Sequence, residues 1–254
     1  MDSPFLLTNE HVIVTGASSG IGRQCAIAFS RLGANLTLLG KSEERLNDTL
    51  SQLERKKEHQ FFCLDLLKSE EMEKVVELSV KKLGKVHGLV NSAGIATTIP
   101  LRSVTNAKME DFFSVNVFGA INLTRIVTKR YFMSPNKGSI IFIASIIGVV
   151  GDSGKSLYGM TKGALISGVR SLSIELAARN IRVNAVSPGV VVTPMLSNAS
   201  YSKDQMAFEK IKNAHPLGLG APEDVANSCA FLLSDASRWI TGSNLIIDGG
   251  YSAV

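Results

Sequence analysis

The chain has 254 residues, of which 45% are hydrophobic and 19% charged, so its composition excludes a disordered protein and allows a full core. Its formal net charge is +5 without a long block of lysine or arginine, which argues against nucleic-acid binding and suits phosphorylated cofactors or acidic partners. The N-terminus has no signal-peptide pattern, and the most apolar stretch, 140–150, is too short to cross a membrane.

Short β-branched segments alternate with longer helical patterns along the chain. In chain order, the predicted elements are strands at 11–15, 34–40, 60–66 and 86–94 (the last with its exit loop), with helices after the first three at 21–33, 43–57 and 69–84. The second half continues with a helical pattern over 106–133, a strand at 138–145, a helix at 156–179 and strands at 181–189 and 244–248.

The strands are apolar on both sides, which predicts a parallel sheet covered by helices on both faces. Right-handed crossovers then give a doubly wound α/β fold of the Rossmann type. Because no linker or repeat interrupts the pattern, we expect a single domain over 1–254. The least regular segment, about 190–220, is predicted to be a lid over a substrate site, with a solvent-facing excursion as the alternative.

Three cysteines, Cys25, Cys63 and Cys229, lie far apart and form no C-x-x-C motif, and the four histidines have no zinc-ligand spacing. We therefore predict a cytoplasmic protein without a metal or a membrane contact. Its cysteines are expected to pack as small hydrophobic residues.

The segment VIVTGASSGIGR places three glycines between the first strand and the first helix. A pyrophosphate binds at such a junction against the N–H groups of the helix. Gly16 permits the tight turn, while Gly20 and Gly22 are expected to let the backbone and the cofactor approach each other. Ser18 and Ser19 add hydroxyl donors. Nucleotide binding is the favoured interpretation, with a purely structural loop as the alternative.

The segment SLYGMTKG puts Tyr158 and Lys162 on one face of a helix. A cation beside a phenol favours the phenolate and so makes the phenol a workable acid, although the pair taken alone is explained equally well by packing. Ser145 ends the predicted strand at 138–145, where open α/β sheets bind ligands. Asn116 lies in a helical pattern that asparagine does not favour, which indicates a function or a helix irregularity.

The motifs TGASSGIG, NSAG (91–94), Ser145, the Tyr158–Lys162 pair and SPG (187–189), in this order, resemble the short-chain dehydrogenase/reductase family. The resemblance runs from about residue 9 to the C-terminus and is strongest to 3-oxoacyl-acyl-carrier-protein reductases. Ser92 departs from it, because the family more often has a second asparagine there.

This resemblance implies a reductase in which a nicotinamide cofactor delivers hydride to a ketone. Tyr158 would donate the proton, and Ser145 would hydrogen-bond the substrate oxygen. Lys162 would support the phenol and hold the ribose of the cofactor. Asn116 would help to hold a water that links Lys162 to solvent.

The end of the second strand predicts which nicotinamide cofactor binds. Gly40 stands where NAD-using relatives usually carry Asp, so Lys41 and Ser42 favour the 2′-phosphate of NADP(H). In the alternative, Lys41 is only solvated and Glu43 or Glu44 reaches the ribose.

Further cofactor contacts are implied by the resemblance. Asp65 resembles an adenine-contacting residue, with a helix-entry cap as the alternative, and Val190 would donate through its backbone to the nicotinamide. The remaining implied contacts are Gly16, Ser18, Ser19, Gly20, Ile21, Gly22, Leu66, Asn91, Ala93, Gly94, Tyr158, Lys162, Pro188, Gly189 and Thr193.

A 3-oxoacyl thioester is the favoured substrate, and a sugar, steroid or xenobiotic ketone or alcohol is the alternative. A non-catalytic nucleotide-binding protein is a third reading that the intact motifs disfavour. An acyl carrier protein would meet Lys129, Arg130 and Arg179 near the crevice, unless these are ordinary surface charges. The family resemblance also implies a homotetramer built through SLSIELAARN and the face of Ile126, Val127 and Tyr131.

Overall fold

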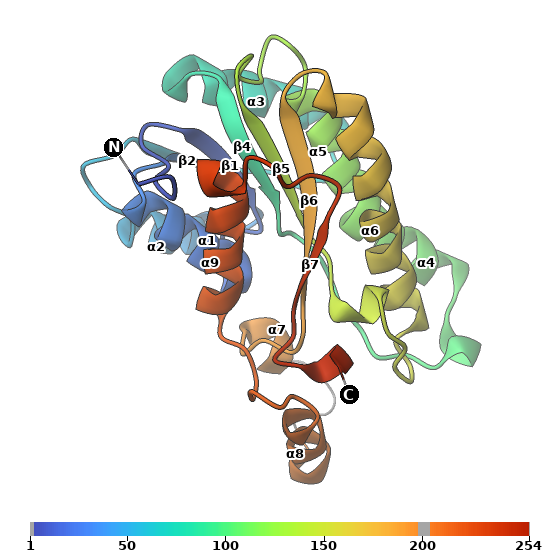
Figure 1. Cartoon of the computed structure of the whole chain (residues 1–254). Coiled ribbons are helices and arrows are strands. Elements are labelled where there is room, and N and C mark those ends of the chain that lie inside the picture. The colour runs from blue at the N-terminus through green and yellow to red at the C-terminus, as the bar shows by residue number, and fades with distance from the viewer. Residues whose placement is uncertain (1–2, 198–203, 254) are drawn as a thin grey trace.

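The computed structural model describes residues 3–197 and 204–253, and these form a parallel sheet between two layers of helices (Figure 1). The strand order is β3-β2-β1-β4-β5-β6-β7, and each neighbouring pair is parallel. The strands are β1 (His11–Thr15), β2 (Asn35–Gly40), β3 (His59–Cys63), β4 (Val86–Asn91), β5 (Gly138–Ile143), β6 (Ile181–Pro188) and β7 (Asn244–Ile247). The predicted α/β fold with a doubly wound parallel sheet is confirmed.

The helices divide between the two faces of the sheet. One face carries α1 (Gly20–Arg31), α2 (Glu43–Ser51) and α9 (Pro222–Leu233). The other carries α3 (Ser69–Leu83), α4 (Asn106–Phe113), a π-helical turn (Ser114–Phe118), α5 (Gly119–Val127) and α6 (Ser156–Ala177). Two short helices, α7 (Pro194–Ser197) and α8 (Gln205–Asn213), follow β6.

Alternation along the buried strands creates two separate cores. Val12 and Val14 of β1 pack into the cluster formed with α1 and α9, whereas Ile13 packs into the cluster formed with α3, α5 and α6. Side chains of a strand point alternately to opposite faces, so a strand covered on both sides is apolar throughout. This explains the continuous apolar segments in the sequence.

Four expectations from the sequence are wrong in detail. The second helix ends at Ser51 rather than 57, and the charged segment after it forms turns. The pattern over 106–133 is interrupted by the π-helical turn and ends at Val127. Helix α8 lies within the segment expected to be irregular, part of which, 198–203, is outside the described residues. Cys63 is exposed, while the other two cysteines are buried as expected.

Helix α9 was not expected from the sequence, yet it carries clear start signals. Pro222 occupies its first turn, and the Asp224 carboxylate accepts the N–H of Ala221 at 2.8 Å. Its buried face packs on α1 and the sheet. None of the helices within the described residues is long and apolar enough to span a membrane.

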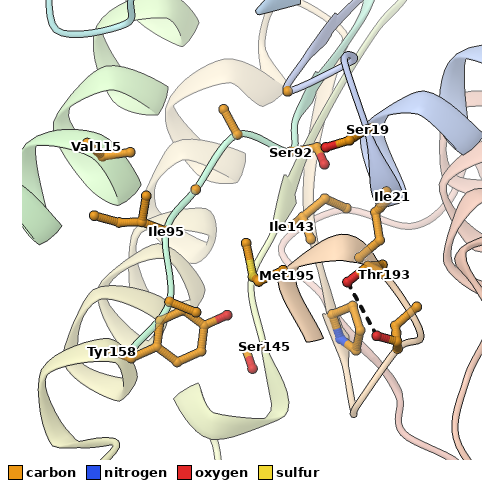
Figure 2. A pocket seen from close by; sticks show the side chains of 18 of the residues that line it. Ser19, Ile21, Ser92, Ile95, Val115, Ile143, Ser145, Tyr158, Thr193 and Met195 are labelled. Carbon is orange, nitrogen blue, oxygen red and sulfur yellow. Dashed lines mark hydrogen bonds between the residues drawn. The ribbon is translucent and has the colours of Figure 1, made fainter. Parts of the chain in front are cut away.

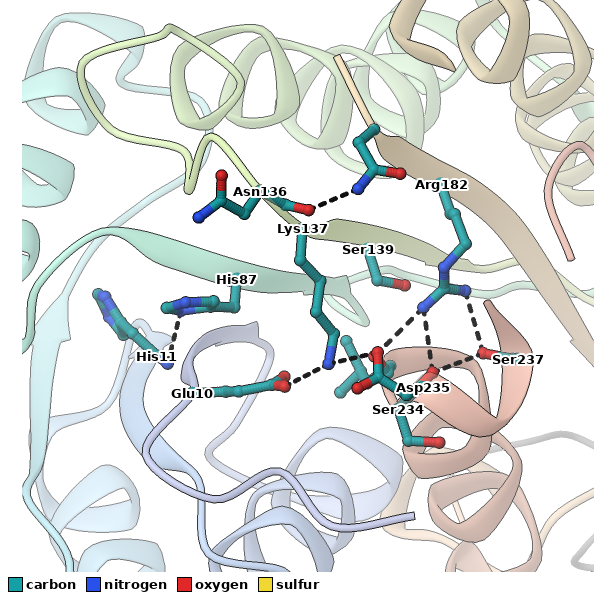
Figure 3. Close-up of polar contacts among 12 residues, drawn as sticks. Glu10, His11, His87, Asn136, Lys137, Ser139, Arg182, Ser234, Asp235 and Ser237 are labelled. Atoms are coloured by element: carbon teal, nitrogen blue, oxygen red, sulfur yellow. Dashed lines mark hydrogen bonds and ion pairs between the residues drawn. The ribbon is translucent and has the colours of Figure 1, made fainter. Parts of the chain in front are cut away.

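An ion network ties α9 to the sheet at the edge where the strands begin (Figure 3). Lys137 pairs with Glu10 at 2.5 Å and with Asp235 at 2.8 Å. Arg182 donates to the carbonyl oxygens of Leu233 and Ser234 at the end of α9. The Arg182 guanidinium therefore satisfies carbonyl groups at the end of the helix.

His11 is fully buried at the same edge. Its Nδ1 lies 2.7 Å from the Gly84 carbonyl oxygen and its Nε2 lies 2.9 Å from the Thr37 hydroxyl, so Nδ1 carries the proton and Nε2 accepts. Burial lowers the pKa of His11 to about 4, because an imidazolium there would be desolvated.

This burial makes stability depend on pH below neutrality. Unfolded His11 binds a proton near pH 6.5, whereas the folded side chain stays neutral down to about pH 4, so its contribution is present above pH 6.5 and is lost as the pH falls. We expect the stability gap between the wild type and His11→Gln to narrow by about 2 kcal/mol between pH 7.5 and pH 5. Urea unfolding at the two pH values measures this gap. A gap independent of pH would show that the folded imidazole titrates normally.

Candidate active site

A cleft of about 1130 Å³ opens where the strands end at their carboxyl termini (Figure 2). The loop after β1, the exits of β4 and β5, the start of α6 and the segment after β6 form its walls. In a parallel sheet these strand ends meet at one edge, and a ligand crevice forms where the strand order reverses, here between β1 and β4.

The glycine loop forms the first wall. Gly16 has a φ of +65°, and a Cβ there would lie 3.0 Å from the backbone of Ala93. Gly22 also lines the cleft, and a Cβ there would lie 2.4 Å from the Gly16 carbonyl oxygen. The absence of a side chain at Gly22 therefore lets helix α1 pack closely against the loop, and its contact with a cofactor stays a prediction. Ser19 precedes α1 without capping it through its side chain, so its hydroxyl remains available at the cleft.

The expected adenosine end contains an ion pair. Lys41 and Asp65 lie 2.8 Å apart, with 65% and 31% of their side chains exposed, and Lys41 holds the pKa of the Asp65 carboxyl below its usual value. Asp65 is not the cap of α3, because Lys68 precedes that helix. Ser42 does cap α2, accepting the N–H of Arg45 at 3.4 Å.

The cleft wall at this end is lined by Lys41, Ser42 and Arg45 but not by Glu43 or Glu44. This placement disfavours the alternative in which one of the glutamates reaches the ribose. Arg45 was missed because a lone arginine inside an amphipathic helix gives no sequence signal of a site.

Tyr158 and Lys162 lie at the start of α6 and both line the cleft. The Lys162 Nζ lies 5.7 Å from the centre of the Tyr158 ring and donates to the Ile143 carbonyl oxygen at 2.8 Å. Ser145 Oγ accepts the N–H of Ile147 at 3.2 Å, which leaves its own proton free to donate. Figure 2 shows the hydroxyls of Tyr158 and Ser145 facing the same cavity.

Asn116 lies in the π-helical turn behind the cleft rather than on its wall. Its side chain accepts the N–H of Ile95 at 2.8 Å and donates to the Ile95 carbonyl at 3.0 Å and to the Thr161 hydroxyl at 3.1 Å. Asn116 therefore clamps the exit of β4 to α6. Thr161, which sequence reasoning missed, completes this clamp, and the water-holding role of Asn116 stays a prediction.

Asn91 is the expected cofactor contact that the structure places elsewhere. Its side chain is buried and donates to the Thr124 hydroxyl of α5 at 3.1 Å, away from the cleft. The exit of β4 is held instead by Thr15, whose hydroxyl accepts the N–H groups of Ser92 and Ala93, each at 3.0 Å. A threonine at a strand end has no sequence signal of this role.

The expected backbone donor, Val190, already has an acceptor in this structure. Its N–H donates to Nε2 of the buried His215 at 3.2 Å. Its neighbour Val191 also lines the cleft, and the Val191 N–H has no acceptor among the described residues. His215 was missed because its role depends on a contact 25 residues away along the chain.

The remaining expected contacts do line the cleft. They are Ser18, Gly20, Ile21, Leu66, Gly94, Pro188, Gly189 and Thr193. The wall beyond Ser145 and Tyr158 carries both apolar and polar side chains. Its polar residues are Thr97, Thr98, Asp111, Asp152 and Lys155, and its apolar residues include Ile95, Val115, Ile147, Met195, Leu196 and Ile211. The last three belong to the segment 190–220, whose role as a lid stays a prediction.

The basic residues proposed to meet a carrier protein do not border the cleft. Lys129 and Arg130 follow α5, and Arg179 follows α6, so all three lie where the chain returns to the starts of strands. The distance from Tyr158 to Arg179 along α6 is about 30 Å at 1.5 Å per residue. Lys129 is also paired with Glu73 at 2.6 Å.

The expected assembly face also needs correction. Ile126 and Val127 are core residues, because they face the sheet, whereas Tyr131 is 71% exposed and remains a candidate. Within residues 3–197 and 204–253, no group of three His, Cys, Asp or Glu side chains could hold a metal ion.

Known proteins resemble this chain along almost its whole length. The family model described as Enoyl-(Acyl carrier protein) reductase matches residues 16–252. A 3-oxoacyl-acyl-carrier-protein reductase of Thermotoga maritima is 34% identical over 94% of this chain and 96% of its own. A glucose 1-dehydrogenase of Gluconobacter oxydans is 33% identical over 94% of this chain and 90% of its own. A solved structure described as a short-chain alcohol dehydrogenase from Sinorhizobium meliloti 1021 has a TM-score of 0.93 and 31% identity over 99% of both chains.

Burial lowers the pKa of Lys162 to about 8, which can be measured directly. At pH 7 the ammonium is then still ~90% charged. In protein labelled with ¹³C at lysine Cε, we expect one resonance to titrate near pH 8 and to be absent from Lys162→Met. Burial also lowers the pKa of Lys155, so that resonance is the control and must persist in the variant. A Lys162 midpoint above pH 10 would contradict the desolvation of the ammonium by burial.

Proposed function

Because the chain belongs to the short-chain dehydrogenase/reductase family, and so is an oxidoreductase that acts on a ketone or an alcohol, we propose that it is an NADP(H)-dependent reductase of 3-oxoacyl thioesters. The observation that carries the proposal is the convergence of Ser145, Tyr158 and Lys162 on the cleft that begins at the glycine loop. Retention of this group also disfavours a protein that only binds nucleotides.

The walls of the cleft fit a dinucleotide. A Cβ on Gly94 would lie 3.1 Å from the Asn116 amide oxygen and 3.6 Å from the Lys162 Nζ, so a side chain there would fill the space beside the lysine. Ser19 offers a hydroxyl and the start of α1 offers N–H groups to a pyrophosphate. Val191 offers its N–H at the nicotinamide end, where the expected donor Val190 is engaged by His215.

In the proposed mechanism, the bound nicotinamide supplies the hydride for the ketone carbon. Ser145 donates its free proton in a hydrogen bond to the substrate oxygen as negative charge develops there. Tyr158 then gives its phenolic proton to that oxygen. Lys162 remains charged at neutral pH and stabilises the phenolate that Tyr158 leaves behind.

The preference for NADP(H) is supported by Lys41 and Arg45 on the cleft wall. Both cations are within the part of the cleft where the second strand ends, and a 2′-phosphate carries charge that they can pair with. Asp65 already shares Lys41, so the phosphate would compete with this carboxylate for the ammonium.

Apolar side chains on the cleft wall support an acyl substrate, because Ile95, Val115 and Ile147 can pack against its chain. Thr97, Thr98 and Asp152 line the same cleft and offer hydrogen-bond partners to a polyhydroxylated substrate, which keeps a sugar as the alternative. The name of the Thermotoga relative agrees with this choice, and that of the Gluconobacter relative keeps the sugar as the second candidate. An acyl carrier protein as donor and a homotetramer through the exposed Tyr131 and Ile174 belong to the same proposal.

The reaction is tested by NADPH oxidation with acetoacetyl thioester, a cyclic ketone, a keto-sugar and a crotonyl thioester. We expect the acetoacetyl thioester to give the highest kcat/KM. Tyr158→Phe is expected to lower kcat by about 10²–10⁴-fold, because the general acid is lost, while the affinity for NADPH changes little. Full activity of Tyr158→Phe would contradict the assignment of the acid, and preference for crotonyl thioester would indicate reduction of a carbon–carbon double bond.

The choice of cofactor is tested with Lys41→Glu. Loss of a charge-assisted hydrogen bond to the 2′-phosphate should lower kcat/KM for NADPH by about 10- to 100-fold and leave that for NADH nearly unchanged. Lys57→Glu, which makes the same charge change on a half-buried residue that donates to Asn9 away from the cleft, is the control. If the ratio of kcat/KM for NADPH to kcat/KM for NADH were unchanged in Lys41→Glu, Lys41 would be excluded as the residue that recognises the 2′-phosphate.

A further inference from the structure

His215 joins three segments that are far apart in the sequence. Its Nε2 accepts the N–H of Val190 at 3.2 Å, directly after β6. Its Nδ1 donates to the Ile211 carbonyl oxygen at 2.7 Å, in the last turn of α8. Its ring packs on Tyr251 near the C-terminus, with ring centres 4.8 Å apart. The side chain is only 3% exposed although it borders the cleft.

These contacts fix the chemical state of the ring. The carbonyl oxygen of Ile211 requires a proton on Nδ1, and the N–H of Val190 requires a lone pair on Nε2. Only the neutral imidazole with its proton on Nδ1 satisfies both partners. A side chain of similar shape without nitrogen atoms would fill the space and satisfy neither.

The contact with Val190 lies at the base of the segment 190–220. The two ends of this segment are joined by backbone hydrogen bonds, from Val192 N–H to the Gly220 carbonyl at 2.9 Å and from Gly220 N–H to the Val190 carbonyl at 3.0 Å. Helix α8, between them, has no buried side chain. A helix with so little packing opens easily unless its ends are held.

We propose that His215 is a positioning residue that couples α8 to the segment that holds the nicotinamide end of the cofactor, an inference that rests on the proposed function. By holding the Gly189–Val190 peptide, His215 sets the direction of the next N–H, that of Val191, a residue that lines the cleft. By holding the Ile211 carbonyl, the same ring places the end of α8 over that peptide. The binding site for the nicotinamide ring is therefore complete only when α8 is in place.

Close packing around the Gly189–Val190 peptide supports this role. A Cβ on Gly189 would lie 3.0 Å from the His215 Nε2 and 2.9 Å from the Asp248 Cα, so the peptide is enclosed on both sides. Asp248 in turn accepts the N–H groups of Gly250 and Ser252 at 3.0 Å and 2.8 Å, which fixes the turn that carries Tyr251. The ring thus rests on a rigid support.

The experiment separates the two halves of the cofactor. Affinities for NADPH and for 2′,5′-ADP, which has no nicotinamide, are measured for the wild type and three variants. His215→Phe keeps a ring beside Tyr251, His215→Asn keeps a donor near Ile211, and His215→Gln restores an acceptor near Val190. His59→Phe is the matched control, because His59 is a half-buried histidine that also bonds two neighbours but lies away from the cleft.

We expect His215→Phe and His215→Asn to bind NADPH about tenfold more weakly, the loss of one buried hydrogen bond, and to bind 2′,5′-ADP as the wild type does. His215→Gln should recover most of the NADPH affinity. Hydrogen exchange gives the second readout: NADPH should slow exchange of the 205–213 amides in the wild type and not in His215→Phe.

The outcomes distinguish the two levels of inference. A wild type that binds neither NADPH nor NADH would overturn the proposed function itself. Normal NADPH affinity in His215→Phe, or an equal loss of NADPH and 2′,5′-ADP affinity, would overturn the positioning role while leaving the proposed function intact. If His215→Gln did not regain NADPH affinity, the positioning role would also be overturned, because the acceptor for the Val190 N–H would then not be the relevant group.

Discussion

The hydrogen bond from the buried Lys162 ammonium to the Ile143 carbonyl oxygen joins the two elements on which the site depends. Ile143 ends β5, and Ser145 follows it by two residues; Lys162 lies one turn after Tyr158 in α6. A buried ammonium without an acceptor would be strongly destabilising, so this contact keeps the end of the strand close to the start of the helix. The hydroxyls of Ser145 and Tyr158 are thereby brought to one cavity by a lysine that also supplies the charge.

Much of the fold could be predicted because buried parallel strands and amphipathic helices have different periodicities, and β1 with its glycine turn is unambiguous. Helix α9 was missed although Pro222 and the acidic first turn mark its start. The clamp of Asn116 and the bond of His215 could not be predicted, since each joins residues that only the folded chain brings together. Arg179 was expected near the crevice, but it follows α6 and so lies at the opposite edge of the sheet, which only the direction of that helix in the fold reveals.

The two edges of the sheet carry different chemistry. At the edge where strands begin, Lys137 pairs with both Glu10 and Asp235, and the neutral His11 is enclosed. At the edge where strands end, polar groups line a cleft, as with the Ser145 hydroxyl, whose proton is free to donate. Polar groups that satisfy each other stabilise the fold, whereas those left facing the cleft are available to a ligand.

The π-helical turn at Ser114–Phe118 sets the rotational phase of α5, which continues directly from it. A wide turn accommodates one residue more than a regular α-helical turn, and each residue of an α-helix corresponds to 100° of rotation. Asn116 faces the exit of β4, and Leu123 and Ile126 face the core. If the turn were a regular α-helical one, Asn116 could keep its position only if Leu123 and Ile126 were rotated out of the core by roughly 100°. The wider turn thus lets one helix both present Asn116 to the exit of β4 and pack its apolar side chains in the core. Deletion of a single residue from this turn would allow only one of these two sets of contacts to form.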